Sequence, residues 1–182
     1  MNNLKFKKND LFIENISIKK LAKKFATPFY CYSSNTIIQK YKKFELPFRN
    51  SDTIICYAVK ANPNIAILKI LSNLGAGAEV VSAGELRRAL KAGVKAKKIV
   101  FSGVGKSYSE IKFAIEKNIL QINIESIEEL ELITKIAKKL RKKVQIGIRI
   151  NPNIDAKTHT KISTGREEDK FGLNIETAEK IF

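Results

Sequence analysis

Two kinds of segment alternate along the chain from residue 53 to residue 150. Short runs of aliphatic and β-branched residues, apolar on both faces, predict buried strands. Longer segments between them carry apolar residues at helical spacing and predict amphipathic helices. Successive strands begin about 22 residues apart, the length of one strand-loop-helix-loop unit. The predicted strands cover residues 53–60, 77–81, 99–102, 121–125 and 144–150, and the predicted helices cover residues 64–74, 82–92, 107–117 and 126–140.

Capping signals support the register of these helices. Three of them begin with a serine that is followed three positions later by a glutamate, which is the pattern of a capping box. The pairs are Ser82 with Glu85, Ser107 with Glu110, and Ser126 with Glu129. Gly75 and Gly93 stand where the C-terminal caps of two helices are expected. The same β-α unit is therefore predicted to recur along the chain.

Repeated β-α units with buried strands leave two architectures, a doubly wound sheet or a (β/α)8 barrel. The dinucleotide-binding form of the doubly wound sheet needs a glycine-rich turn after its first strand, and residues 61–64 contain no glycine. The barrel is therefore predicted. A barrel needs eight strands, and this chain supplies about five. We expect the polypeptide to be incomplete, because an open arc of strands leaves two unpaired edges.

Barrel chemistry takes place at the carboxyl ends of the strands. That rule selects Lys60, Ser82, residues 102–103, Glu125 and residues 149–151 as mouth residues. A desolvated lysine amine is a nucleophile suited to Schiff-base chemistry with a carbonyl cofactor. On the strand alone, a solvated lysine at a strand end is the simpler interpretation of Lys60.

The N-terminal part of the chain follows a different pattern. Residues 1–34 are predicted to form a separate segment, and residues 35–182 a partial barrel. A short helix is expected over residues 17–25, because a serine begins it and a proline follows it. An aromatic run predicts a short strand over residues 29–32, and helical spacing predicts a helix over residues 35–44.

The net charge of +16 invites a nucleic-acid-binding interpretation. The lysines are scattered over predicted helix faces and loops, so solvated helix surfaces are preferred and no nucleic-acid partner is expected. Cys31 and Cys56 are isolated, which predicts neither a disulfide framework nor a metal site. Residues 1–12 have no signal-peptide core and no apolar run reaches membrane-spanning length. A cytoplasmic protein without a membrane partner is expected.

Several motifs together resemble one enzyme family. Residues 57–62, YAVKAN, resemble the cofactor-lysine motif of the fold-type III pyridoxal-phosphate enzymes, which are built on an alanine-racemase-like barrel. Residues 75–86, 99–107 and 149–172 resemble later segments of the diaminopimelate decarboxylases, including the runs RINP, STG and KFG. Residues 27–32 resemble the strand that, in the family, leads to a separate C-terminal β-domain.

The resemblance implies an incomplete pyridoxal-phosphate-binding (β/α)8 barrel with carboxy-lyase activity. It assigns Lys60 as the catalytic lysine, which holds pyridoxal phosphate as a Schiff base, and Glu79 and Arg149 as cofactor-binding residues. The alternative for Glu79 and Arg149 is a salt bridge inside the barrel. The implied reaction is decarboxylation of the small amino-acid substrate meso-2,6-diaminopimelate to L-lysine, the last step of lysine biosynthesis, by a homodimer.

Related activities form the alternatives: a carboxynorspermidine, ornithine or arginine decarboxylase, or a non-catalytic barrel protein that binds pyridoxal phosphate. The family's glycine-rich phosphate loop, stacking histidine and C-terminal β-domain are absent from residues 1–182. His159, the only histidine, matches a loop position and is expected to be a loop or interface residue. We therefore expect a fragment that, in isolation, neither decarboxylates nor holds the cofactor tightly.

Overall fold

A sheet of five parallel strands forms the centre of the computed structural model, which describes residues 3–154, 157 and 171–181. The strands are β4 (Cys56–Ala58), β5 (Gly77–Val80), β6 (Ile99–Phe101), β7 (Gln121–Ile124) and β8 (Ile146–Ile148). They pair side by side in sequence order. Sequential order is the arrangement of a barrel wall, whereas a doubly wound sheet reverses direction at a switch point. The predicted incomplete barrel of five strands is confirmed.

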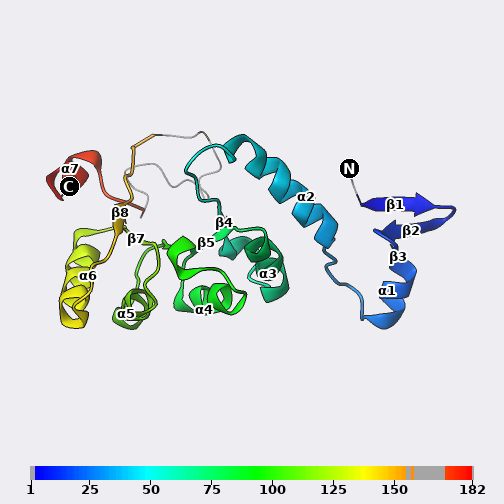
Figure 1. The fold of residues 1–182 in the computed structure, drawn as a ribbon, viewed down its shortest axis with the longest axis horizontal. Helices are drawn as coiled ribbons and strands as arrows, with labels where there is room; N and C mark the ends of the chain where they lie inside the picture. The colour runs from blue at the N-terminus through cyan, green and yellow to red at the C-terminus, as the bar shows by residue number, and fades with distance from the viewer. Residues whose placement is uncertain (1–2, 155–156, 158–170, 182) are drawn as a thin grey trace.

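Four helices connect the strands and cover one face of the sheet (Figure 1). They are α3 (Ile65–Asn73), α4 (Ala83–Lys91), α5 (Tyr108–Glu116) and α6 (Ile127–Leu140), and a 3-10 turn, η3 (Ala96–Lys98), leads into β6. Gly75 and Gly93 follow α3 and α4 with φ of 92° and 91°, the left-handed conformation that their predicted role as C-terminal caps requires.

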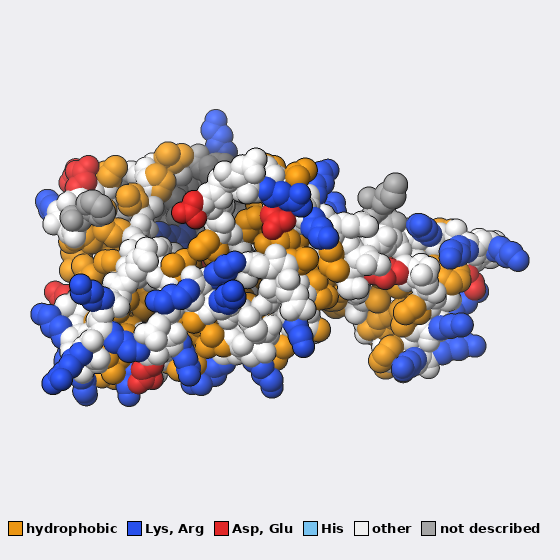
Figure 2. All heavy atoms as spheres, viewed as in Figure 1, with side chains coloured by type: hydrophobic (Ala, Val, Ile, Leu, Met, Phe, Trp, Pro, Cys, Tyr) orange, Lys and Arg blue, Asp and Glu red, His pale blue; other side chains and the backbone are white. Residues whose placement is uncertain are grey.

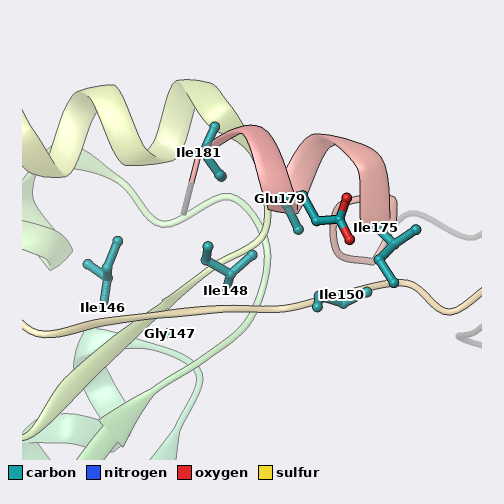
Figure 3. Close-up of a pocket in the computed structure, with 8 residues that line it drawn as sticks. Ile146, Gly147, Ile148, Ile150, Ile175, Glu179 and Ile181 are labelled. Carbon is teal, nitrogen blue, oxygen red and sulfur yellow. The ribbon is translucent and has the colours of Figure 1, made fainter.

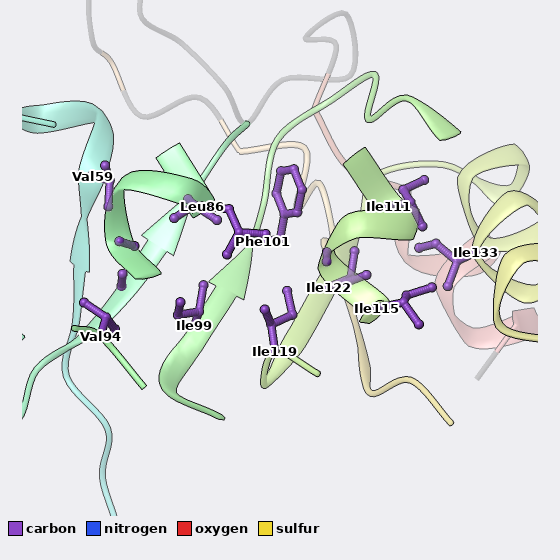
Figure 4. Packing of buried hydrophobic residues seen from close by; sticks show 14 of the residues in the cluster. Val59, Leu86, Val94, Ile99, Phe101, Ile111, Ile115, Ile119, Ile122 and Ile133 are labelled. Atoms are coloured by element: carbon purple, nitrogen blue, oxygen red, sulfur yellow. The ribbon is translucent and has the colours of Figure 1, made fainter. Parts of the chain in front are cut away.

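The core lies between this face of the sheet and the helices (Figure 4). Alternate residues of the three central strands point into it and are at most 1% exposed: Ala78, Val80, Ile99, Phe101, Ile122 and Ile124. The helices contribute side chains that are equally buried, among them Leu86 and Ile111. Each of the larger side chains stabilises the fold by about 1.5–3 kcal/mol through burial. The opposite, inner face of the sheet is left for the odd-numbered residues of β5 and β7.

The first strand of the sheet ends earlier than predicted. Pairing stops at Ala58, and the chain enters one 3-10 turn, η2 (Val59–Ala61). Val59 is fully buried in the core, so the turn is anchored there. The next side chain, Lys60, is exposed.

The chain pairs once more after β8. The Asn151 N–H donates to Leu173 O at 2.7 Å, and the Leu173 N–H donates to Arg149 O at 2.8 Å, which makes a parallel bridge between Ile150 and Leu173. Helix α7 (Ile175–Ile181) follows directly. A sixth strand position therefore begins beside β8, as continued winding of a barrel requires.

The N-terminal residues form a small antiparallel sheet that the sequence pattern did not predict. Strands β1 (Leu4–Lys7), β2 (Asp10–Ile13) and β3 (Ile16–Ser17) pair in order. The expected helices follow as α1 (Ile18–Lys24) and α2 (Ser34–Glu45), and a 3-10 turn, η1 (Leu46–Phe48), continues α2.

The strand predicted over residues 29–32 is wrong. These residues lie between α1 and α2 and pair with no strand of the described chain (Figure 1). Tyr30 is 91% exposed, and its ring stacks on that of Tyr32 with 6.5 Å between centroids. A strand is held by ladder hydrogen bonds to a neighbour, so strand propensity alone does not make one.

The predicted capping boxes are present in modified form. Only α5 has the complete reciprocal box, between Ser107 and Glu110. In α4 and α6 the serine accepts its expected bond, but the glutamate accepts from the residue before the serine. These bonds run from the Val81 N–H to Glu85 at 2.8 Å and from the Glu125 N–H to Glu129 at 2.9 Å. Both glutamates thus tie a strand end to the helix that follows it.

Lysine and arginine side chains are spread over the face of the molecule shown in Figure 2, interrupted by apolar and neutral groups. Scattered cations are typical of solvated helix surfaces, whereas nucleic-acid recognition needs them gathered. Within the described ranges, no helix has the length and apolar character needed to cross a membrane.

Candidate functional site

The inner face of the sheet is polar at its centre. Gln121 donates from Nε2 to Asn123 Oδ1 at 2.7 Å, and Asn123 donates from Nδ2 to Ser102 Oγ at 3.0 Å. Gly147 on the next strand leaves room for this chain, because a Cβ there would lie 2.6 Å from Asn123 Oδ1. Barrel interiors are usually filled by bulky aliphatic side chains. A hydrogen-bonded polar chain here leads instead to the strand end at Ser102, on the mouth side.

Lys60 lies at the carboxyl end of β4, in η2, as predicted for a mouth residue. The segment after it is fixed because Asn62 Oδ1 accepts the Asn64 N–H at 3.0 Å and Asn64 caps α3. The described residues offer the Lys60 amine no hydrogen-bond or ion-pair partner. An exposed primary amine in this position is available to a carbonyl group.

Glu79 lies on β5, directly opposite Ala58 of β4, and is half-buried on the inner face. Within the described part of the chain, its carboxylate makes no hydrogen bond or salt bridge. Its charge acts on Cys56: burial raises the pKa of the Cys56 thiol, and the negative charge of Glu79 adds to that rise. Lys60, just beyond the end of β4, and Glu79, on the adjacent strand β5, therefore make no salt bridge with each other.

Arg149 follows β8 and forms a salt bridge, but its partner is Glu125. The guanidinium donates from one nitrogen to both carboxylate oxygens of Glu125, at 3.1 and 3.3 Å. It also lies over the Phe171 ring, 4.7 Å from the centroid. A salt bridge between Glu79 and Arg149 is not formed, because β5 and β8 are separated by two strands, whereas Glu125 directly follows the neighbouring β7.

Lys106 is a charged residue of this region that was not predicted from the sequence. It lies in the loop between β6 and α5, and its side chain is only 1% exposed. Its Nζ donates to Gly103 O at 2.6 Å, to Asn123 O at 2.7 Å and to Glu129 Oε1 at 3.0 Å. In the sequence, Lys106 is distinguished only by its position in a strand-to-helix loop beside Gly105. The chain has many solvated lysines, so this position alone did not identify it as buried.

The remaining described residues considered from the sequence are not part of the site formed by Lys60, Glu79 and Arg149. His159 and the STG run lie outside the described residues. Ser82 and Glu85 serve the start of α4, as the capping interpretation predicted. Cys31 and Cys56 are free thiols, and the described residues contain no cluster of three metal-binding side chains.

The sequence is similar to decarboxylases along almost its whole length. Residues 34–182 match the family described as pyridoxal-dependent decarboxylase, pyridoxal binding domain. Over 179 residues the chain is 48% identical to a diaminopimelate decarboxylase of Aquifex aeolicus, covering 98% of this chain and 42% of that protein. The chain spans about 40% of the length of the curated relatives it matches.

Solved structures agree with this assignment. The crystal structure of diaminopimelate decarboxylase from Helicobacter pylori complexed with L-lysine superposes with a TM-score of 0.87 at 50% identity, covering 91% of this chain and 42% of that chain. A lysine/ornithine decarboxylase from Vibrio vulnificus complexed with cadaverine shares the fold alone, with a TM-score of 0.71 at 21% identity, covering 90% of this chain and 39% of that chain. The chain therefore belongs to the pyridoxal-dependent decarboxylases, in the pyridoxal binding domain of that family.

Proposed function

We propose that these residues are the cofactor-binding part of a diaminopimelate decarboxylase, a carboxy-lyase that converts meso-2,6-diaminopimelate to L-lysine. The observation that carries the proposal is Lys60, an exposed amine at the carboxyl end of a barrel strand, without a partner among the described residues. Identity to relatives named diaminopimelate decarboxylase is far higher than identity to the lysine/ornithine decarboxylase, which supports this substrate over ornithine.

The residues present fit pyridoxal phosphate chemically. When bound, this cofactor supplies an electron sink for the charge left by a departing carboxylate. Lys60 supplies the amine that holds the cofactor aldehyde covalently and, once released, an amine that can carry a proton. Glu79 supplies a carboxylate on the adjacent strand. Arg149 supplies a positive charge, restrained by Glu125 and 38% exposed, suited to anionic oxygens.

We also infer that the isolated 182-residue chain is inactive. Barrel phosphate sites typically use the loops after strands seven and eight, and the described residues supply five paired barrel strands. On the family resemblance, the whole protein is proposed to act in the cytoplasm as a homodimer. The same reasoning predicts that the isolated chain does not hold the cofactor tightly. Incubating it with pyridoxal phosphate and borohydride tests that prediction, and a stoichiometric adduct would overturn it.

The catalytic proposal is tested in the whole protein that contains this chain. Lys60→Ala is expected to abolish both the borohydride-stable adduct, measured by mass spectrometry, and CO2 release from meso-2,6-diaminopimelate. Lys91→Ala is the matched control, because Lys91 is exposed in the last turn of α4. The control is expected to keep both. An adduct that persists in Lys60→Ala, or a parent protein that decarboxylates ornithine in preference to diaminopimelate, contradicts the proposal.

A further inference from the structure

Four residues next to Arg149 form a closed ring of hydrogen bonds: Gly103, Lys106, Glu125 and Glu129. The Gly103 N–H donates to Glu125 Oε1 at 3.1 Å, and the Glu125 N–H donates to Glu129 Oε2 at 2.9 Å. Lys106 closes the ring by donating to Glu129 Oε1 at 3.0 Å and to Gly103 O at 2.6 Å. The ring ties the loop after β6 to the end of β7 and the first turn of α6.

The charged members of this ring are buried. The side chains of Lys106, Glu125 and Glu129 are 1%, 4% and 9% exposed. Lys106 has three donors and finds three acceptors, so the ammonium group is fully satisfied. A buried ion pair is an inefficient source of stability, because desolvation offsets much of the attraction between the charges. Its use at a strand end is better explained by the orientation that it imposes on neighbouring groups.

The group that receives this orientation is the carboxylate of Glu125. Its Oε1 accepts from the Gly103 N–H and from Arg149, while its backbone N–H is held by Glu129. These hydrogen bonds fix the orientation of both the main chain and the carboxylate of Glu125. The guanidinium of Arg149 follows, because one of its nitrogens contacts both Glu125 oxygens. Of these charged side chains, Arg149 alone is exposed by more than a third.

We infer that Lys106 and Glu129 are positioning residues for Arg149. They hold the Glu125 carboxylate, which in turn presents the Arg149 guanidinium to anionic oxygens at the barrel mouth. This inference rests on the proposed function, since the oxygens belong to the cofactor phosphate or to a substrate carboxylate. It adds Lys106 and Glu129 to this region of the site, where the sequence predicted Glu125 and Arg149 as mouth residues and assigned a binding role to Arg149 alone.

The test is a mutant cycle in the whole protein. The double variant Lys106→Met, Glu129→Gln removes both buried charges together, which avoids leaving one unpaired. We expect its affinity for pyridoxal phosphate to fall, or its KM for diaminopimelate to rise, by about tenfold. Loss of a residue that orients a binding group typically has an effect of this size. Near-visible absorbance titration reports the cofactor phosphate, and the KM reports the substrate carboxylate. In an Arg149→Met background, the double variant is expected to cause no further weakening.

Lys142→Met is the matched control. Lys142 Nζ also donates three hydrogen bonds, to Ile115 O, Glu116 O and Asn118 Oδ1, but it precedes β8 and so lies at the opposite end of the sheet. Its loss is expected to lower the melting temperature and to leave both affinities unchanged. The inference would be overturned if the double variant weakened binding further in the Arg149→Met background. It would also be overturned if Lys142→Met weakened binding of cofactor or substrate as much as the double variant does. The borohydride adduct on Lys60 is read in every variant, and its absence from the parent protein identifies a failure of the proposed function itself.

Discussion

Gly77 is the residue at which the inner face of the sheet leaves least room. A Cβ added there would meet the backbone carbonyl oxygen of Lys98 and would lie 2.8 Å from Cys56 Sγ. A backbone oxygen cannot rotate away as a flexible side chain can. The requirement for glycine therefore arises from the close approach of neighbouring chain segments.

Gly77→Ala is expected to lower the free energy of unfolding by about 1–3 kcal/mol, the usual cost of overpacking. Gly84→Ala is the matched control, because Gly84 is exposed in α4 and its nearest contact would be Ser82 Oγ at 3.7 Å. The control is expected to raise the free energy of unfolding by up to about 1 kcal/mol through helix propensity. Urea unfolding measures both, and equal effects would show that the crowding at Gly77 is relieved.

The two cysteines differ in reactivity. Burial and the charge of Glu79 raise the pKa of the Cys56 thiol, so less of the reactive thiolate is present at neutral pH. Cys31 is exposed. Iodoacetamide is expected to alkylate Cys31 first and Cys56 only after denaturation, followed by peptide mass spectrometry. The Cys31→Ser variant should then resist labelling in the native state, and rapid native labelling of that variant would contradict the expectation.

Helices α4 and α5 are joined by one carboxylate. Glu110 Oε1 accepts the Ala83 N–H at the start of α4 at 2.9 Å, and its other oxygen accepts from Ser107 at the start of α5. The bond from Ala83, followed by those from Ser107, lowers the pKa of Glu110 below its ordinary value of 4.5. The N-termini of two neighbouring helices thus share an acidic cap, which also suits the helix dipoles.

This arrangement predicts a pH dependence of stability. Because the pKa of Glu110 is lower in the folded state, its contribution is fully present above pH 4.5 and is lost as the pH falls through the folded-state value. Glu110→Gln is expected to flatten the fall in melting temperature below pH 4.5. Glu116→Gln, at the exposed end of the same helix, serves as the control. Identical acid profiles for Glu110→Gln and the parent chain would exclude this role.

The five-stranded sheet is open, and its last strand, β8, borders an apolar groove (Figure 3). The groove has a volume of about 710 Å³ between β8 and α7, and five isoleucines line it: Ile146, Ile148, Ile150, Ile175 and Ile181. In a closed barrel such a surface is covered by the next strand and helix. Left open on an isolated chain, it is a surface for association.

The isolated chain is accordingly expected to self-associate with increasing concentration. Ile150→Lys places a charge in the groove and is expected to raise the monomer fraction in sedimentation velocity. Ile16→Lys adds the same charge to the N-terminal sheet, where the isoleucine is similarly exposed, at 51% against 47% for Ile150. The control should leave association unchanged. Equal shifts in both variants would point to net charge as the cause.

Local patterns were sufficient for the elements of the barrel wall. The helices α3 to α6 and the strands β4 to β8 lie where hydrophobic periodicity, serine caps and terminal glycines predicted them, to within a few residues. The position of Lys60 at the mouth followed from the same reasoning, because strand order and strand direction fix which residues reach that end. These features depend on residues close together in the sequence.

Tertiary structure decided the rest. Residues 29–32 have the composition of a strand but pair with no strand edge among the described residues, and Arg149 pairs with Glu125 because β7 and β8 are adjacent. Lys106 is distinguished from the other lysines only by the acceptors that the fold brings around it. Hydrophobic periodicity is a local property, so it was enough to predict the repeating units and the lysine at their mouth. Pairing between charged groups depends on which strand ends become neighbours, and only the assembled sheet settles that.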